Sequence, residues 1–189
     1  MTIKFKSLLF VLFIAIISIS SCKKDDDADR PVTEVDKGSI FPDKVVFNLT
    51  KKNDSTYTRS FAYNLPSSSS NVRDTIVFPI DTNSSLATYN CTLEFFENNV
   101  NKTDAIRSLG TRYMICFKDF STNDLSVAVK EFDSKGIALS LTTEWKAKLK
   151  NVNGNIRITL NYNQQEKIGT CDTGSRIVEI WFPYKTIED

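Results

Sequence analysis

The sequence predicts an all-β protein built as an antiparallel, immunoglobulin-like β-sandwich. Three observations support this prediction. From position 44 onward, apolar residues recur at every second position, which is the period of a strand with one buried face. Clusters of Ser, Thr, Asn, Asp and Gly interrupt the alternation at short intervals and indicate turns. Thirteen phenylalanines supply core volume. A lipocalin-like β-barrel is the alternative architecture.

The first half of the expected domain contains four strands. Alternating apolar positions predict them at 44–50, 56–63, 74–80 and 86–97. Pro79, near the end of the third strand, indicates either an edge strand or a strand terminus, because proline cannot donate a hydrogen bond to a ladder. The serine-rich run 67–71 is expected to be a surface loop.

The second half combines one helical turn with further strands. The segment 103–106 predicts the helical turn, which Gly110 closes. Strands are predicted at 112–118 and 125–132, and then, after a turn at 133–136, at 137–141, 156–162 and 177–182. Asn153-Gly154 predicts a two-residue hairpin turn that opens the strand at 156–162.

The N-terminus has the pattern of a secretory signal peptide. Lys4 and Lys6 precede an apolar run at 8–17, and small residues follow. The apolar run is too short to span a bilayer. We therefore expect residues 1–21 to be a cleaved signal, residues 22–40 to be a flexible charged tether, and residues 41–189 to form a single domain.

The sequence around the cleavage site resembles known lipoprotein signals. Ile19-Ser20-Ser21-Cys22 resembles the bacterial lipobox, which implies a lipid anchor on Cys22. The charged run that follows is similar to the lipoprotein export signal of Bacteroidetes, which implies an outer-membrane protein that faces the cell exterior. The residues of that run are Lys24, Asp25, Asp26 and Asp27. The run is also suited to a solvated tether, and both roles can hold together.

Composition excludes several functional classes. The 24 basic and 23 acidic residues nearly balance, so no basic stripe predicts a nucleic-acid partner. The sequence contains no histidine, which excludes the usual Ser-His-Asp and Cys-His catalytic systems and His-ligated metal or haem sites. No cofactor is predicted, and we expect a protein that is not an enzyme.

The domain contains three cysteines, Cys91, Cys116 and Cys171. At most one intrachain disulfide can form, and spacing leaves the pairing open. Met114 and Cys116 share one face of the strand predicted at 112–118, where a thioether and a thiol could bind Cu(I). Packing in the core is the favoured role for both side chains.

Two further groups of residues are candidates for recognition or modification. Trp145, Trp181 and Tyr184 could form an aromatic platform for a glycan or a peptide, although packing is the favoured role for each ring. Alternation places Trp181 on the outward face of its strand. Thr75 and Ser55 each follow an aspartate and resemble the short O-glycosylation sequon of Bacteroidetes.

From Asp74 onward the chain resembles a family of small β-rich Bacteroidetes surface lipoproteins without a settled activity. The order of several short motifs carries the resemblance: Asp74-Thr75-Ile76, the segments 136–139 and 154–160, Lys167, the segment 173–178, and Phe182-Pro183. The chain lacks the histidines that such relatives carry near the positions of Cys116 and Tyr162. If those histidines bind a metal in the relatives, the site is lost or replaced here.

These observations predict a non-catalytic binding or accessory module anchored in the outer membrane. Its expected partners are the membrane, through the lipid, and either an outer-membrane receptor of the TonB-dependent class or a surface glycan or protein. Metal or haem capture by Met114 and Cys116 is the alternative function. A hydrolase that works without histidine ranks third.

Overall fold

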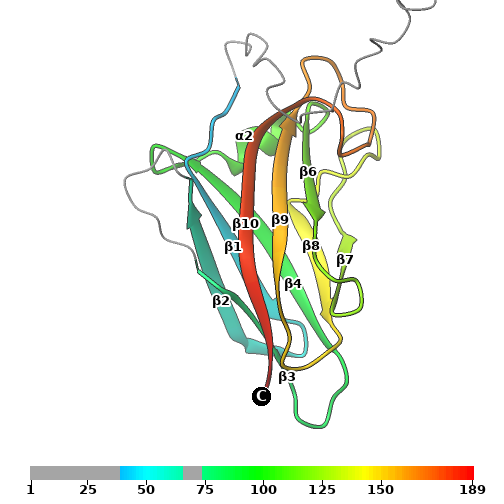
Figure 1. Cartoon of the computed structure of the whole chain (residues 1–189). Coiled ribbons are helices and arrows are strands. Elements are labelled where there is room, and N and C mark those ends of the chain that lie inside the picture. The colour runs from blue at the N-terminus through cyan, green and yellow to red at the C-terminus, as the bar shows by residue number, and fades with distance from the viewer. Residues whose placement is uncertain (1–38, 66–73) are drawn as a thin grey trace, which may run out of the picture. The chain divides into compact units, whose positions relative to one another are not determined.

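The computed structural model describes residues 39–65 and 74–189, which form two β-sheets and one short helix (Figure 1). These residues all belong to the compact unit 33–189. The signal peptide, Cys22, the charged run at 24–27 and the serine-rich run at 67–71 lie outside the described residues.

The larger sheet, called sheet A here, has the strand order β2-β1-β4-β8-β7, with β5 paired to β4. All its pairs are antiparallel. Its strands are β1 (Lys44–Lys51), β2 (Asp54–Asn64), β4 (Ala87–Glu97), β5 (Val100–Asn101), β7 (Leu125–Val129) and β8 (Thr142–Ala147). Helix α2 (Thr103–Ser108) follows β5, and the Gly110 N–H donates to the carbonyl of Arg107 as the helix ends.

The smaller sheet, sheet B, has the order β3-β10-β9-β6. Its strands are β3 (Ile76–Ile80), β6 (Tyr113–Lys118), β9 (Asn153–Tyr162) and β10 (Ser175–Glu188). Strands β6, β9 and β10 pair antiparallel, whereas β10 and β3 run parallel. The prediction of a purely antiparallel fold is therefore wrong for this one pair. Of the two alternatives that Pro79 indicated, β3 is an edge strand.

Apolar side chains from both sheets fill the space between them. Trp145 of β8 is fully buried, and its ring centroid lies 6.0 Å from that of Phe47 in sheet A and 5.2 Å from that of Phe117 in sheet B. Its indole N–H donates to Thr143 Oγ1 at 2.9 Å. Ile40, which the sequence analysis assigned to the tether, is also buried and donates its N–H to the Tyr113 hydroxyl.

The predicted all-β sandwich is confirmed. A closed lipocalin-like barrel is not formed, because the described strands make two separate hydrogen-bonded sheets. The predicted turn at 133–136 is confirmed, with Gly136 at a φ of 76°. The strand predicted at 137–141 is wrong: that segment makes only an isolated bridge at Ala138, and the regular strand, β8, begins at Thr142.

The Asn153-Gly154 hairpin prediction is also wrong. Both residues pair with β10 inside β9, Asn153 with Lys185 and Gly154 with Tyr184. The glycine is needed for packing rather than for a turn, because a Cβ at position 154 would lie 2.5 Å from the Tyr184 ring. The chain reverses before this point, in the segment 148–152, where Asn151 has a φ of 57°.

Gly154→Ala is expected to destabilise the fold by about 1–3 kcal/mol, because the added methyl group overpacks against the buried Tyr184 ring. Urea unfolding measures the loss. In a Tyr184→Leu background the same alanine should cost less, since the ring that it meets is gone. An equal cost in both backgrounds would contradict this explanation.

Candidate functional site

The structure separates the three aromatic residues that were predicted to form one platform. Trp145 is fully buried and Tyr184 is only 2% exposed, so both belong to the core. The prediction of a platform of three aromatic rings is therefore wrong. The alternation along β10 explains the burial of Tyr184, because this residue lies on the inward face of the strand together with Phe182. Trp181 points the other way and is 41% exposed, as the alternation predicted.

Trp181 forms a polar and aromatic surface with its neighbour on β9. Trp181 and Arg157 are direct cross-strand partners, and the guanidinium carbon lies 5.4 Å from the centroid of the indole ring. This distance is typical of a cation–π contact. Both residues lie on the outer face of sheet B, where β9 and β10 run side by side (Figure 1).

Ion pairs extend from Arg157 across this face. Its Nε lies 2.5 Å from Asp119 Oδ2, and its Nη1 lies 3.5 Å from Glu179 Oε1. Glu179 also pairs with Arg176, with 2.5 Å between Nη1 and Oε2. We call Trp181, Arg157, Asp119, Glu179 and Arg176 the Trp181 face. It offers an aromatic ring, hydrogen-bond donors and hydrogen-bond acceptors within one surface.

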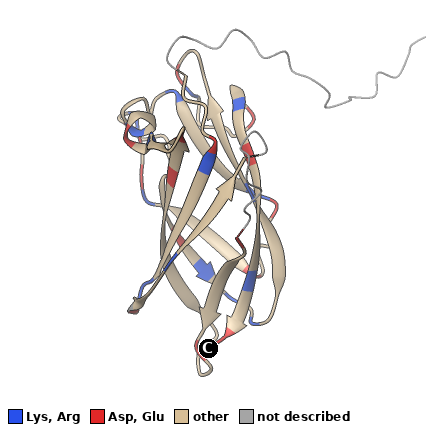
Figure 2. Ribbon diagram, turned by 90° about the vertical axis from the view of Figure 1, so that its left-hand side faces the viewer, with Lys and Arg blue, Asp and Glu red and all other residues tan. Residues whose placement is uncertain are grey.

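Charged side chains of both signs are interspersed over the strands and loops (Figure 2). On sheet B this mixing continues beside the Trp181 face, where Lys118 Nζ lies 2.7 Å from Asp172 Oδ1. Lys118 is the cross-strand partner of Arg157 on β6. Lys118, Arg157 and Arg176 on this side of the sheet therefore each have an acidic partner close by.

A disulfide contradicts the hypothesis that Met114 and Cys116 bind a metal ion. Cys116 is bonded to Cys171, so its sulfur is not a free thiolate. Met114 and Cys116 do share the outer face of β6, as predicted, but both are buried. Cys91 holds the free thiol among the described cysteines, and burial raises the pKa of that thiol.

The disulfide holds the segment 163–174, here called the cap, against the outer face of sheet B. The Asn161 side-chain amide donates to the carbonyl of Cys171 at 2.8 Å. Lys167, in the middle of the cap, has a fully buried ammonium 3.2 Å from Asp133 Oδ2. The same ammonium donates to the carbonyls of Tyr113 and Ala138. Cap, β6 and the loop 131–139 are thus joined at one buried cation.

Burial opposes the charge on Lys167 and lowers its pKa, although Asp133 acts in the opposite direction. Burial also acts to raise the pKa of Asp133. It is outweighed by the backbone N–H groups of Ile137 and Lys135 and by the Lys167 ammonium, which together lower that pKa. Because each charge has several partners, this arrangement holds the cap, β6 and the loop 131–139 together.

A cavity of about 260 Å³ lies between α2 and the loop 131–139. Arg107 and Glu131 line it and form an ion pair with 2.7 Å between Nε and Oε1. Phe132, also in the lining, is 54% exposed. No residue that the sequence analysis proposed for a site lines this cavity.

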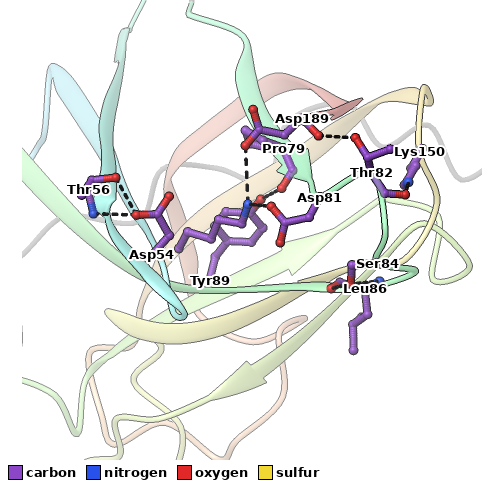
Figure 3. Close-up of polar contacts among 11 residues, drawn as sticks. Asp54, Thr56, Pro79, Asp81, Thr82, Ser84, Leu86, Tyr89, Lys150 and Asp189 are labelled. Carbon is purple, nitrogen blue, oxygen red and sulfur yellow. Dashed lines mark hydrogen bonds and ion pairs between the residues drawn. The ribbon is translucent and has the colours of Figure 1, made fainter.

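A second buried cation lies at the end of the sandwich where β10 finishes. The Lys51 ammonium lies 2.5 Å from Asp81 Oδ1 and 3.6 Å from Asp189 Oδ2, although the residue is only 5% exposed. Figure 3 shows the side chains of Asp81 and Asp189 pointing toward this nitrogen. Beside them, the Tyr89 hydroxyl donates a hydrogen bond to the carbonyl of Pro79. The cluster joins β1 to the ends of β3 and β10.

Burial acts to lower the pKa of Lys51, but hydrogen bonds and charge from Asp81 and Asp189 outweigh it and raise the pKa. This raised pKa adds stability that is fully present below the ordinary lysine pKa of about 10.5 and is lost as the pH rises through the folded-state value.

Lys51→Met is therefore expected to lower the free energy of unfolding by about 1 kcal/mol near neutral pH, since its acidic partners are largely exposed and screened. The difference from wild type should shrink in strong alkali. Urea unfolding across the pH range measures it. Lys52→Met, at the exposed neighbouring position, is the matched control with little expected effect. A difference that is independent of pH would contradict the linkage.

The remaining site predictions have separate outcomes. Thr75 is exposed, which an O-glycosylation site requires, whereas the side chain of Ser55 lies outside the described residues.

Across 39–65 and 74–189, no helix is long and apolar enough to cross a membrane. In the same part of the chain, no three Cys, Asp or Glu side chains gather in a way that could hold a metal ion.

No family model matches this chain. Neither a curated protein nor a solved structure matches it. The interpretation of the Trp181 face therefore rests on its own geometry.

Sequence reasoning missed Arg157, the Lys167–Asp133 pair and Lys51. A signal existed for Arg157, because it occupies an outward position in the clean alternation of β9. Its partnership with Trp181 depends on the register between β9 and β10, which the pattern of either strand alone does not give. Lys167 belongs to the motifs of the family resemblance, but nothing in the sequence indicated that it or Lys51 is buried, because charged residues are usually exposed.

Proposed function

We propose that this chain is a lipid-anchored protein of the outer membrane, displayed on the cell surface, whose β-sandwich is a non-catalytic binding module. The observation that carries the proposal is the sequence Ile19-Ser20-Ser21-Cys22, followed at once by a lysine and acidic run. The module serves as an accessory to an outer-membrane receptor of the TonB-dependent class or binds a surface ligand directly.

Three features of the domain support a binding role. The absence of histidine removes the commonest general base from the whole sequence. The buried lysines are enclosed by structural partners. The Trp181 face, by contrast, leaves an aromatic ring 41% exposed beside charged groups, which is a composition suited to recognition.

Metabolic labelling with an alkyne fatty acid in a Bacteroidetes host tests the anchor. Wild-type protein should take up the label, and Cys22→Ser should abolish it. Cys91→Ser is the matched control, because that cysteine is buried in the domain and should leave labelling unchanged. Label that persists in Cys22→Ser would reject the anchor.

Antibodies against the domain test whether the protein is displayed on the cell surface, since immunoglobulins do not cross an intact outer membrane. Intact wild-type cells should be stained. Replacing Lys24, Asp25, Asp26 and Asp27 by alanine should make staining depend on permeabilisation while fatty-acid labelling persists. Staining of wild-type cells only after permeabilisation would reject surface display.

A further inference from the structure

We infer that the Trp181 face is a binding site for a neutral saccharide. The inference rests on the proposed function, because it names the ligand class of the binding module. It is carried by the direct juxtaposition of an exposed indole ring, a guanidinium and a carboxylate on the neighbouring strands β9 and β10, with a second carboxylate, Asp119, just after β6.

The indole ring supplies the contact surface. Trp181 is exposed on β10, where its pairing with Arg157 of β9 fixes the position of the side chain. The C–H groups on one side of a pyranose ring form an apolar surface that can lie on such an aromatic ring. Because β9 and β10 hold the backbone rigidly, little conformational entropy is lost when a ligand binds.

The polar groups supply specificity. Arg157 and Arg176 present only hydrogen-bond donors, whereas Asp119 and Glu179 present only acceptors. A sugar hydroxyl both donates and accepts, so neighbouring hydroxyls can use both kinds of group at once. The side chains of Asp119 and Arg176 are 42% and 51% exposed, so their polar atoms are within reach of a ligand.

The balance of charge favours a neutral ligand. Arg157 already lies between two carboxylates, and Glu179 already pairs with Arg176. An anionic ligand would meet Asp119 and Glu179, and a cationic ligand would meet Arg157, so either would replace existing ion pairs. A peptide strand has no edge to join on this surface, since backbone hydrogen bonds run in the plane of the sheet.

Iodide quenching of tryptophan fluorescence provides the test in the full-length protein in detergent micelles. Of the two tryptophans, Trp145 is fully buried and Trp181 is exposed, so iodide reports on Trp181. The probes are neutral oligosaccharides of glucose, mannose, xylose and N-acetylglucosamine, with acidic uronic-acid oligosaccharides alongside. At least one neutral probe should protect Trp181 from iodide in a saturable manner.

Calorimetry on variants then locates the site. Trp181→Ala should weaken binding of the protective saccharide by about tenfold. Arg157→Leu should weaken it several-fold, because it removes donors at the same position. Leu149→Ala is the matched control: Leu149 is also exposed, at 46%, but lies in the connection between β8 and β9, and its loss should leave the affinity unchanged.

Protection by no neutral probe, protection by acidic probes alone, or unchanged affinity of Trp181→Ala would each overturn the inference. A peptide or protein ligand that depends on Trp181 would overturn it as well. The antibody experiment remains independent. Surface staining without saccharide binding would reject only the ligand class. Saccharide binding by a protein that is not displayed would reject only the proposed surface location.

Discussion

Removal of the Cys116–Cys171 disulfide, by the double substitution Cys116→Ala and Cys171→Ala, is expected to lower the free energy of unfolding by about 4 kcal/mol. The two cysteines are 55 residues apart, and a cross-link over a loop of that length restricts the unfolded chain by about this amount. Urea unfolding of the full chain, monitored by fluorescence, measures the difference.

A thiol reductant supplies the control for this prediction. It should lower the stability of wild-type protein to that of the double variant and leave the double variant unchanged. The buried Cys91 thiol is present in both proteins and is protected by its raised pKa and by burial. A loss well below 1 kcal/mol in both comparisons would show that the cap contributes little to the fold.

Lys167→Ala is expected to cost about 3–5 kcal/mol, because it leaves the buried Asp133 carboxylate without its cation. The carbonyls of Tyr113 and Ala138 also lose their donor. Urea unfolding again provides the measurement. Hydrogen exchange should show faster exchange at the N–H groups of the loop 131–139 and of the cap.

Lys135→Ala is the matched control for Lys167. It removes an ion pair with Glu166 that joins the same two segments at the surface, where both side chains are about half exposed. Exposed pairs contribute little, so a change below about 1 kcal/mol is expected. Equal effects of the two substitutions would refute the conclusion that burial makes Lys167 important.

The alternation of apolar residues was enough to predict the sandwich, because period-two patterning reports directly which face of a strand is buried. It correctly placed most of the strands and put Trp181 outside the core. It could not predict that Trp145 is buried, because Lys146 and Lys148 follow it closely and make this part of the sequence look exposed. Burial of Trp145 depends on β8 pairing with β4 and β7, which is a long-range property.

Errors arose where one residue type serves two purposes. Gly154 was assigned to a turn because glycine beside asparagine commonly forms hairpins, whereas here the glycine makes room for Tyr184. The disulfide pairing could not be derived from spacing, since it depends on how the cap lies over β6. The ion pairs of the Trp181 face required the register of three strands, β6, β9 and β10.

The position of β10 constrains the order in which the fold can assemble. β10 is the last described strand in the sequence, yet it lies between β3 and β9 in sheet B. β3 therefore has no neighbour in its own sheet until β10 arrives, whereas β1, β2 and β4 can pair as soon as they emerge. β6 and β9 can pair before β10 is in place, but sheet B stays incomplete until then, and the slow step of folding should be the docking of this final strand.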